Sequence, residues 1–304
     1  MTSYTGSVTD NDALRRVMWD VDGVIHIAGL ISYGTFPDFK GMERVNVDGT
    51  LNVIRACLRQ NVTRLLYCSS VDVVIGFEPI RGGGEDDTPV PPKFLFPGYP
   101  ESKLQGERLV LSAHGQPCDN GEKLHTLSLR ANVMYGELDP YYVTTGFRNA
   151  ASMGGKLIQV GNGEALFQQC YVGNSAAAFV QADAALAEKP NVGGQAFFIP
   201  DDTPLQNSFK FLEPFLESRG FSLSQTYIPY SLVYWSLYVT EMVLKALSPL
   251  VKLHLKTASC SIQYINMDLY FRSEKARSVF GFTPVYSPAE AKERSLAYYK
   301  SVKL

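Results

Sequence analysis

Short apolar runs alternate with helical patterns along the chain, and this alternation constrains the fold more than any other feature. The runs are rich in β-branched or aromatic residues, as buried strands are, and they cover residues 23–27, 65–68, 127–130 and 197–199. Between them, residues 46–60 and 99–113 are expected to be helices, the first with apolar side chains at helical spacing. Strands that alternate with helices predict an α/β protein built on a parallel sheet.

The composition excludes several classes of protein. The chain has 304 residues, of which 45% are hydrophobic, enough to bury a large core. A formal net charge of −2 provides no cationic footprint, so we expect no nucleic-acid partner. The five cysteines are scattered without a CxxC pair, which argues against a disulfide framework and against a zinc site. The polar N-terminus lacks the apolar segment of a secretion signal, so we expect a reducing, cytoplasmic-type setting.

A tyrosine and a lysine at helical spacing form the first candidate for chemistry. Tyr99 and Lys103 are four residues apart, so both side chains lie on one face of the expected helix. A nearby ammonium group stabilises phenolate, and we therefore expect Lys103 to lower the pKa of Tyr99 from its usual value of about 10. Tyr99 would then serve as a general acid and base.

Two serines end the preceding apolar strand. A hydroxyl group at the carboxyl end of a parallel strand projects toward the crevice where such folds bind ligands, and it can hydrogen-bond a reacting oxygen. Side chains alternate along a strand, so only one of Ser69 and Ser70 faces the site. The sequence leaves this choice open, and we take Ser70.

A second pair with the same spacing, Tyr299 and Lys303, lies near the C-terminus. No strand precedes it, and the surrounding helix is highly charged, so we interpret Tyr299 as structural. His26 lies inside an apolar run and Arg130 ends another, and we interpret these two side chains as structural as well.

Five motifs occur in the order that extended short-chain dehydrogenases use. They are Val24-Ile-His-Ile-Ala28, Asn46-Val-Asp-Gly-Thr50, the Ser69-Ser70 strand end, Tyr99-Pro-Glu-Ser-Lys103 and Leu129-Arg-Ala-Asn-Val-Met-Tyr-Gly136. Within that group, Tyr171-Val-Gly-Asn174, residues 194–204, Tyr234-Trp235 and residues 284–291 resemble the 3β-hydroxysteroid dehydrogenase/isomerase family. The resemblance extends from near Val8 to near Lys300.

The resemblance implies a Rossmann-like, doubly wound parallel sheet that binds NAD, with NADP left open, and a smaller C-terminal substrate lobe. We expect a partial dinucleotide-binding domain over residues 1–140. The substrate lobe is expected over residues 141–304, with segments near 170–200 returning to complete the sheet.

The resemblance also implies roles for single residues. Tyr99 would exchange a proton with the 3-oxygen of a steroid, Ser70 would orient that oxygen, and Lys103 would also bind the nicotinamide ribose. Asn46 would support Lys103 in a proton relay, and a helix N-cap is the equally weighted alternative for this residue. The implied cofactor contacts are Lys103, Tyr99, Ala28 and Ala131.

Two features depart from the family pattern. No Gly-x-x-Gly-x-x-Gly phosphate loop occurs in the 304 residues, although a dinucleotide fingerprint requires one. We therefore expect that roughly two βα units of the family fold are missing and that this chain binds NAD weakly or not at all. In addition, Ala131 stands where the family has a proline beside the nicotinamide.

Residues 230–248, between Pro229 and Pro249, predict a helix close to the ~20 residues that span a bilayer. Glu241, Lys245 and three tyrosines form one stripe along it, and apolar side chains form the other face. This amphipathic pattern favours a helix that lies on a membrane surface without crossing it. Packing against the substrate lobe is the alternative.

The leading hypothesis is an oxidoreductase that converts a steroid 3β-hydroxyl to the 3-ketone with NAD, with or without Δ5–Δ4 isomerisation. One alternative is a dehydrogenase of a 4-carboxysterol or a nucleotide sugar. The other is a non-catalytic, membrane-associated fragment. The expected partners are a steroid and the surface of the endoplasmic reticulum or mitochondrial membrane, with a homo-oligomer left open.

Overall fold

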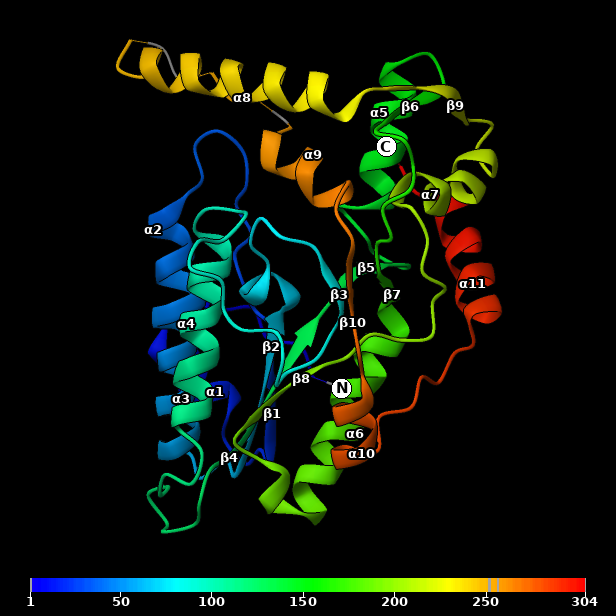
Figure 1. Ribbon diagram of the computed structural model, residues 1–304. Helices are drawn as coiled ribbons and strands as arrows, with labels where there is room; N and C mark the ends of the chain where they lie inside the picture. The colour runs from blue at the N-terminus through cyan, green and yellow to red at the C-terminus, as the bar shows by residue number, and fades with distance from the viewer. Residues whose placement is uncertain (1, 251–252, 256, 304) are drawn as a thin grey trace.

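The computed structural model describes residues 2–250, 253–255 and 257–303 (Figure 1). At its centre lies a parallel four-stranded sheet in the order β1-β2-β4-β8. Its strands are β1 (Gly23–His26), β2 (Arg64–Ser70), β4 (His125–Ala131) and β8 (Gln195–Phe198). These are the four predicted apolar runs, with boundaries that differ by no more than two residues.

Helices cover both faces of this sheet (Figure 1). They are α3 (Gly49–Arg59) and α4 (Tyr99–Ser112) on one face, and α6 (Val172–Glu188) and α10 (Glu274–Phe280) on the other. Leu65 of β2 packs in the core under α3 and α4, whereas its neighbour Leu66 packs in the core under α6 and α10. Successive side chains thus serve opposite layers, as strand geometry requires. The predicted doubly wound α/β fold is confirmed.

The helix that carries Asn46 begins earlier than predicted. α2 (Phe39–Met42), the π-helical turn η1 (Glu43–Asp48) and α3 follow one another without a break. The run is capped by Asp38, whose carboxylate accepts a hydrogen bond from the N–H of Gly41 at 2.9 Å. Asn46 therefore lies inside the helical run and not at its start. The N-cap alternative for Asn46 is wrong.

Three two-stranded parallel sheets join segments that are far apart in the sequence. They pair β3 (Ile80–Gly83) with β10 (Leu269–Phe271), β5 (Val133–Tyr135) with β7 (Gln169–Tyr171), and β6 (Lys156–Val160) with β9 (Ser222–Ile228). None of these pairings was predicted, because most of these strands are too short for side-chain alternation to mark them.

Two parts of the C-terminal half return to the central sheet. One comprises α6 and β8, which lie in the region of residues 170–200. The other, which the sequence did not indicate, comprises β10 and α10, and Phe280 of α10 packs against Phe197 of β8. The remaining helices α5 (Val143–Ser152), α7 (Ser208–Glu217) and α11 (Pro288–Ser301) share an apolar core of their own.

Helix α8 (Tyr230–Leu247) extends along one end of the molecule beside α9 (Ser259–Ile265) (Figure 1). Glu241 was expected on a polar stripe with Lys245, but its carboxylate turns inward. It accepts hydrogen bonds from the backbone N–H of Ser259 at 2.5 Å and from the Ser259 hydroxyl at 3.2 Å. Among the described residues, no helix combines the length and apolar character needed to cross a bilayer.

Three short elements complete the described fold. They are α1 (Asn11–Val17), which packs against α3, and the 3-10 turns η2 (Val71–Val74) and η3 (Pro190–Val192). Of these, η2 matters for the site, because it directly follows the end of β2.

Candidate active site

The four predicted catalytic residues gather at the carboxyl end of the sheet. Ser70 is the last residue of β2, Tyr99 is the first residue of α4, and Lys103 follows one helical turn later. Asn46 comes from η1, which packs against α4. All four side chains are buried, with 9% or less of each residue exposed.

Ser70, rather than Ser69, is the serine whose hydrogen bonding acts to lower the pKa of the Tyr99 phenol. The Ser70 hydroxyl also accepts a hydrogen bond from the backbone N–H of Asp72 at 3.2 Å, which starts the turn η2. The hydroxyl oxygen of Ser69 is buried and has no hydrogen-bond partner in the described part of the chain. The geometry therefore favours Ser70 as the serine that can share a reacting oxygen with Tyr99.

The ammonium group of Lys103 points at the end of β2. It donates a hydrogen bond to the carbonyl oxygen of Cys68 at 2.5 Å and lies 4.2 Å from the centre of the Tyr67 ring. The spacing of four residues places Lys103 on the same face of the helix as Tyr99. It does not fix which groups the long, flexible side chain of Lys103 contacts.

The expected lowering of the Tyr99 pKa by Lys103 is wrong for this structure. Burial raises the pKa of Tyr99 well above its ordinary value, and the negative charge of Asp72 raises it further. The hydrogen bond with Ser70 acts in the opposite direction. The Lys103 ammonium group lies against Cys68 and Tyr67, and the pKa of Tyr99 stays raised.

Asn46 is held at both ends of its amide. Its Oδ1 accepts a hydrogen bond from the N–H of Leu30 at 2.7 Å, and its Nδ2 donates to the carbonyl oxygen of Leu30 at 2.9 Å. Nδ2 also donates to the hydroxyl of Ser102, the residue before Lys103, at 2.9 Å. Asn46 thus connects the segment after β1 to the helix that carries Tyr99 and Lys103, which is a supporting role.

The backbone after β1 lies beside the side chains of Lys103 and Asn46. Ala28 is exposed there, and a Cβ atom placed on the next residue, Gly29, would lie 3.7 Å from the Lys103 ammonium nitrogen and 3.5 Å from Asn46 Oδ1. An ammonium group carries three donors, and only one is used by Cys68. Two donors of the Lys103 ammonium group are therefore left for a ligand beside this backbone.

Ala131 contributes differently from what was expected. It ends β4 and pairs in register with Ser70, but its methyl group is buried in the apolar core under α6. A contact from Ala131 to a bound ligand must come from its backbone. The next residue, Asn132, is also buried, and its Oδ1 has no partner among the described residues, so it is a polar group that the sequence did not single out.

The residues interpreted as structural have structural contacts. Arg130 forms a 2.7 Å ion pair with buried Glu107. His26 Nε2 lies 2.9 Å from the hydroxyl of Thr50, and burial, followed by the charge of Lys103, lowers its pKa to about 3.

The second tyrosine at this spacing, Tyr299, is fully buried in the separate C-terminal core. Its hydroxyl donates to Asp139 Oδ2 at 2.9 Å and accepts from the N–H of Gly136 at 2.8 Å. Both hydrogen bonds hold the fold together, and neither involves the serine pair, so the structural interpretation of Tyr299 is supported.

No cluster of three or more His, Cys, Asp or Glu side chains in the described ranges could hold a metal ion. Asp72 is an acidic side chain close to Tyr99 that the sequence did not single out. Its position could have indicated this, because Asp72 lies two residues after Ser70, directly beyond the end of the strand that carries the predicted serine.

Comparisons with known proteins agree with this architecture. The chain matches a UDP-glucuronic acid 4-epimerase from Bacillus cereus, solved with UDP-glucuronic acid and NAD, with a TM-score of 0.68 and 19% identity over 97% of this chain and 80% of that one. It also matches a dTDP-glucose 4,6-dehydratase from Streptomyces venezuelae, solved with NAD, with a TM-score of 0.65 and 16% identity over 97% of this chain and 78% of that one. At these identities the likeness shows the fold alone.

The family is shown by a different match. The model of the 3-beta hydroxysteroid dehydrogenase/isomerase family matches residues 1–230, which include the ends of β1 and β2, the turn η1 and the whole of α4. The chain therefore belongs to the 3-beta hydroxysteroid dehydrogenase/isomerase family.

Proposed function

We propose that the protein oxidises the 3β-hydroxyl group of a steroid to a ketone with NAD. The observation that carries this proposal is the meeting of Ser70 at the end of β2 with Tyr99 at the start of α4, with Lys103 one helical turn after Tyr99, in a member of this family. NADP stays an alternative, because no described residue distinguishes the two cofactors. The isomerisation of a Δ5 to a Δ4 double bond belongs to the same proposal as a second step.

The chain's own residues have separate tasks in this reaction. Ser70 donates a hydrogen bond to the substrate oxygen, and Tyr99 takes the hydroxyl proton during oxidation or returns it during reduction. Lys103, Tyr99 and the backbone at Ala28 and Ala131 hold the nicotinamide ribose. NAD, when bound, supplies the hydride acceptor and a positively charged ring.

The surroundings of Tyr99 support a largely apolar substrate. Tyr33 lies edge-on to Tyr99 with ring centres 5.5 Å apart, and Phe96 lies 4.7 Å from Tyr33. Aromatic surfaces recognise hydrocarbon skeletons by dispersion and by exclusion of water. A nucleotide sugar, which the solved neighbours bind according to their descriptions, needs many polar partners, so it is the second candidate.

The direct test is turnover by the purified protein, run beside a version extended at its N-terminus by the nucleotide-binding βα units of a family member, because this chain is expected to bind NAD weakly. The protein is mixed with NAD and a 3β-hydroxy-Δ5 steroid, NADH formation is followed by absorbance, and the product is identified by mass spectrometry. We expect the 3-ketone, with the position of its double bond reporting the isomerase step. Turnover of a 4-carboxysterol or UDP-glucose instead would select another substrate. Failure to bind NADH, measured by calorimetry, would support a non-catalytic fragment.

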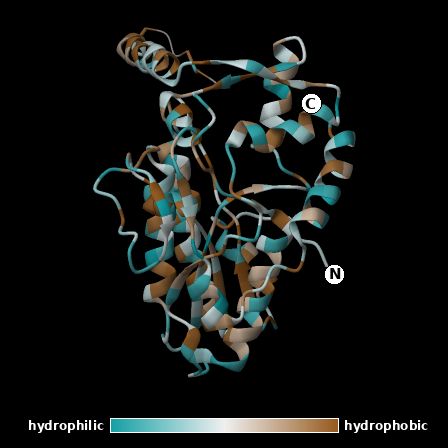
Figure 2. Cartoon of the chain, turned by 45° about the vertical axis from the view of Figure 1, so that its right-hand side comes forward, coloured by the Kyte–Doolittle hydropathy of each residue, from teal (hydrophilic) through white to brown (hydrophobic). Residues whose placement is uncertain are grey.

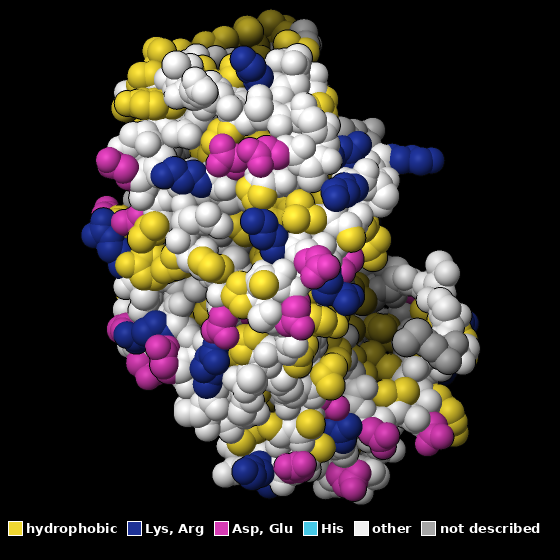
Figure 3. Space-filling view, turned by 90° about the vertical axis from the view of Figure 1, so that its right-hand side faces the viewer, with side chains coloured by type: hydrophobic (Ala, Val, Ile, Leu, Met, Phe, Trp, Pro, Cys, Tyr) yellow, Lys and Arg dark blue, Asp and Glu magenta, His cyan; other side chains and the backbone are white. Residues whose placement is uncertain are grey.

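We also propose that α8 attaches the protein to the surface of the endoplasmic reticulum or mitochondrial membrane. Its outward face exposes apolar side chains with half or more of their surface accessible, which are Leu232, Trp235, Val239, Met242 and Val243. Figure 2 shows hydrophobic residues along this helix, and Figure 3 shows acidic and basic side chains intermixed on a neighbouring face. An exposed apolar helix face is typical of interfacial attachment.

A further inference from the structure

The carboxylate of Asp72 accepts hydrogen bonds from two tyrosines that lie in distant parts of the chain. It lies in η2 and is buried, with 6% of the residue exposed. The hydroxyl of Tyr33, in the segment after β1, donates to Asp72 Oδ2 at 3.1 Å. The hydroxyl of Tyr264, in α9, donates to Asp72 Oδ1 at 3.1 Å. One carboxylate therefore ties two segments together directly beside Ser70, whose hydroxyl accepts from the Asp72 N–H.

The two tyrosine rings belong to one aromatic wall next to Tyr99. The ring of Tyr33 is edge-on to that of Tyr99, and Tyr33 and Tyr264 both pack against Phe96, with ring centres 4.7 and 5.1 Å away. Tyr264 also packs edge-on against Phe167 at 5.1 Å. Tyr33 keeps 41% of its surface exposed although its hydroxyl is bound, so this residue lies at the surface end of the wall.

The direction of the two hydroxyl groups decides what this wall can bind. Because both donors are used by Asp72, the rings present carbon and not polar atoms beside the reacting residues. A ring system of hydrocarbon gains dispersion and loses no hydrogen bonds against such a surface. A sugar would leave its own hydroxyl groups unpaired there.

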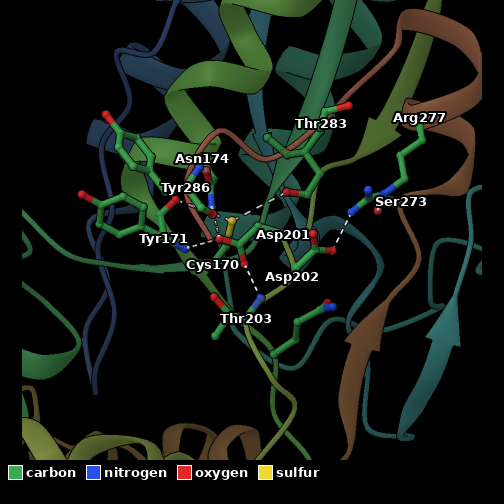
Figure 4. Close-up of polar contacts among 12 residues, drawn as sticks. Cys170, Tyr171, Asn174, Asp201, Asp202, Thr203, Ser273, Arg277, Thr283 and Tyr286 are labelled. Atoms are coloured by element: carbon green, nitrogen blue, oxygen red, sulfur yellow. Dashed lines mark hydrogen bonds and ion pairs between the residues drawn. The ribbon is translucent and has the colours of Figure 1, made fainter. Parts of the chain in front are cut away.

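A second buried carboxylate, Asp201, has a different set of partners. Asp201 accepts from the backbone N–H groups of Tyr171 at 3.0 Å and Thr203 at 3.1 Å, and from the amide of Asn174 at 2.8 Å (Figure 4). Its partners are two backbone groups and an amide close to it in the fold. Asp72 is instead bound by two long side chains whose rings reach the site. Asp201 is thus a matched control for the loss of a buried carboxylate.

We propose that Asp72 is a positioning residue that selects a hydrocarbon substrate by holding Tyr33 and Tyr264 as an apolar wall beside Ser70 and Tyr99. This inference rests on the proposed function and names the structural basis of its specificity. Asp72 accepts no proton from the substrate in this proposal, and its effect on substrate affinity acts through the two tyrosines.

The test compares Asp72→Asn, Tyr33→Phe and Tyr264→Phe in the whole chain. We expect Asp72→Asn to raise the KM for the steroid at least fivefold and to leave the KM for NAD unchanged. Because the loss of the carboxylate also removes one cause of the raised pKa of Tyr99, kcat is compared on the pH plateau of each protein, where it should differ less than threefold. Each Tyr→Phe variant, which is more conservative, should raise the steroid KM by a smaller factor. The triple variant should match Asp72→Asn, because the carboxylate acts through these tyrosines.

Hydrogen exchange provides a measurement that does not depend on turnover. Asp72→Asn should speed amide exchange in residues 30–36 and 259–265, whereas Asp201→Asn should speed it around β7 and α6 and leave the steroid KM unchanged. A lower melting temperature with unchanged steroid KM and unchanged exchange in both segments would overturn the proposal. If wild-type protein turns over no steroid but exchange in both segments still depends on Asp72, the proposed function fails and the positioning role stands.

Discussion

The ammonium group of Lys103 lies 4.2 Å from the centre of the Tyr67 ring, over the strand that leads to the site. With its hydrogen bond to the Cys68 carbonyl, this contact anchors Lys103 to β2 and leaves two donors for a ligand. Lys103 is therefore placed to bind a ligand with these two donors. It can influence Tyr99 through the position of that ligand.

Lys103→Met should weaken cofactor binding more than steroid binding. A hydrogen bond to a charged group contributes about 1.5–3 kcal/mol, so we expect the KM for NAD to rise roughly 10- to 150-fold. Steady-state kinetics with NAD as the varied substrate measure this. Lys303→Met, in the second tyrosine–lysine pair, is the control and should leave both constants unchanged. If the KM for NAD is unaltered in Lys103→Met, Lys103 does not bind the nicotinamide ribose.

Tyr99→Phe should abolish oxidation while NADH affinity falls by no more than the loss of one neutral hydrogen bond to the ribose, about tenfold. Only the phenolic proton donor is lost, and general acid–base groups contribute roughly 10²–10⁴-fold to rates. Turnover and calorimetric NADH titration of the same preparation give both numbers. Residual activity above about a tenth of wild type would contradict the assignment.

The control for this variant is Tyr299→Phe, which carries the same chemical change at the buried structural tyrosine. It leaves Asp139 and the N–H of Gly136 without a partner, so the free energy of unfolding should fall by about 1–3 kcal/mol. Activity per folded molecule should be retained, because Tyr299 lies in the separate C-terminal core.

His26 should make the protein less stable in mild acid. Burial lowers its pKa to about 3 in the folded state, against 6.5 as the ordinary value, so the unfolded chain binds more protons between these two pH values. This contribution to stability is complete above about pH 6.5 and is lost as pH falls toward 3, by up to about 1.4 kcal/mol per pH unit.

Urea unfolding at several pH values between 5 and 8 measures this slope. His26→Gln keeps a hydrogen-bonding group near Thr50 and should flatten it, whereas His254→Gln should not. Equal slopes for His26→Gln and wild type would show that His26 does not carry the effect.

Replacing Trp235 and Val239 with Ser should release the protein from membranes. These two side chains expose 59% and 57% of their surface on the outward face of α8, so the change removes much of the proposed lipid contact. Flotation with vesicles of mixed phospholipids measures binding. A wild-type protein that stays unbound, or a C-terminal tag protected from protease by sealed vesicles, would contradict surface attachment.

Local patterns in the sequence were enough to predict the central sheet and the residues on its carboxyl end. Ser70, Tyr99 and Lys103 follow directly from strand ends and helical spacing, both of which are short-range features. Spacing on a helix fixes a face but not the reach of a side chain, so the contact of Lys103 with Tyr67 could not be foreseen. The position of Asn46 inside the helical run could not be foreseen either, because a π-helical turn has no simple sequence pattern.

Contacts between distant segments escaped prediction. Tyr33 and Tyr264 are separated by more than two thirds of the chain, and each looks like an ordinary loop or helix tyrosine in its own surroundings. Only the folded chain shows that both hydroxyl groups meet at Asp72. The same holds for β10, which pairs with β3 across most of the sequence.

Glu241 binds the first residue of α9, and Tyr264 in that same short helix binds Asp72, so α8 and the reacting groups are connected in series. Thermodynamic linkage gives this connection a reciprocal meaning. If lipid contact at α8 changes steroid affinity by some factor, bound steroid must change the affinity for lipid by the same factor. Steroid-loaded and empty protein would then partition differently between vesicles and water, and the membrane would retain one of the two forms in preference to the other.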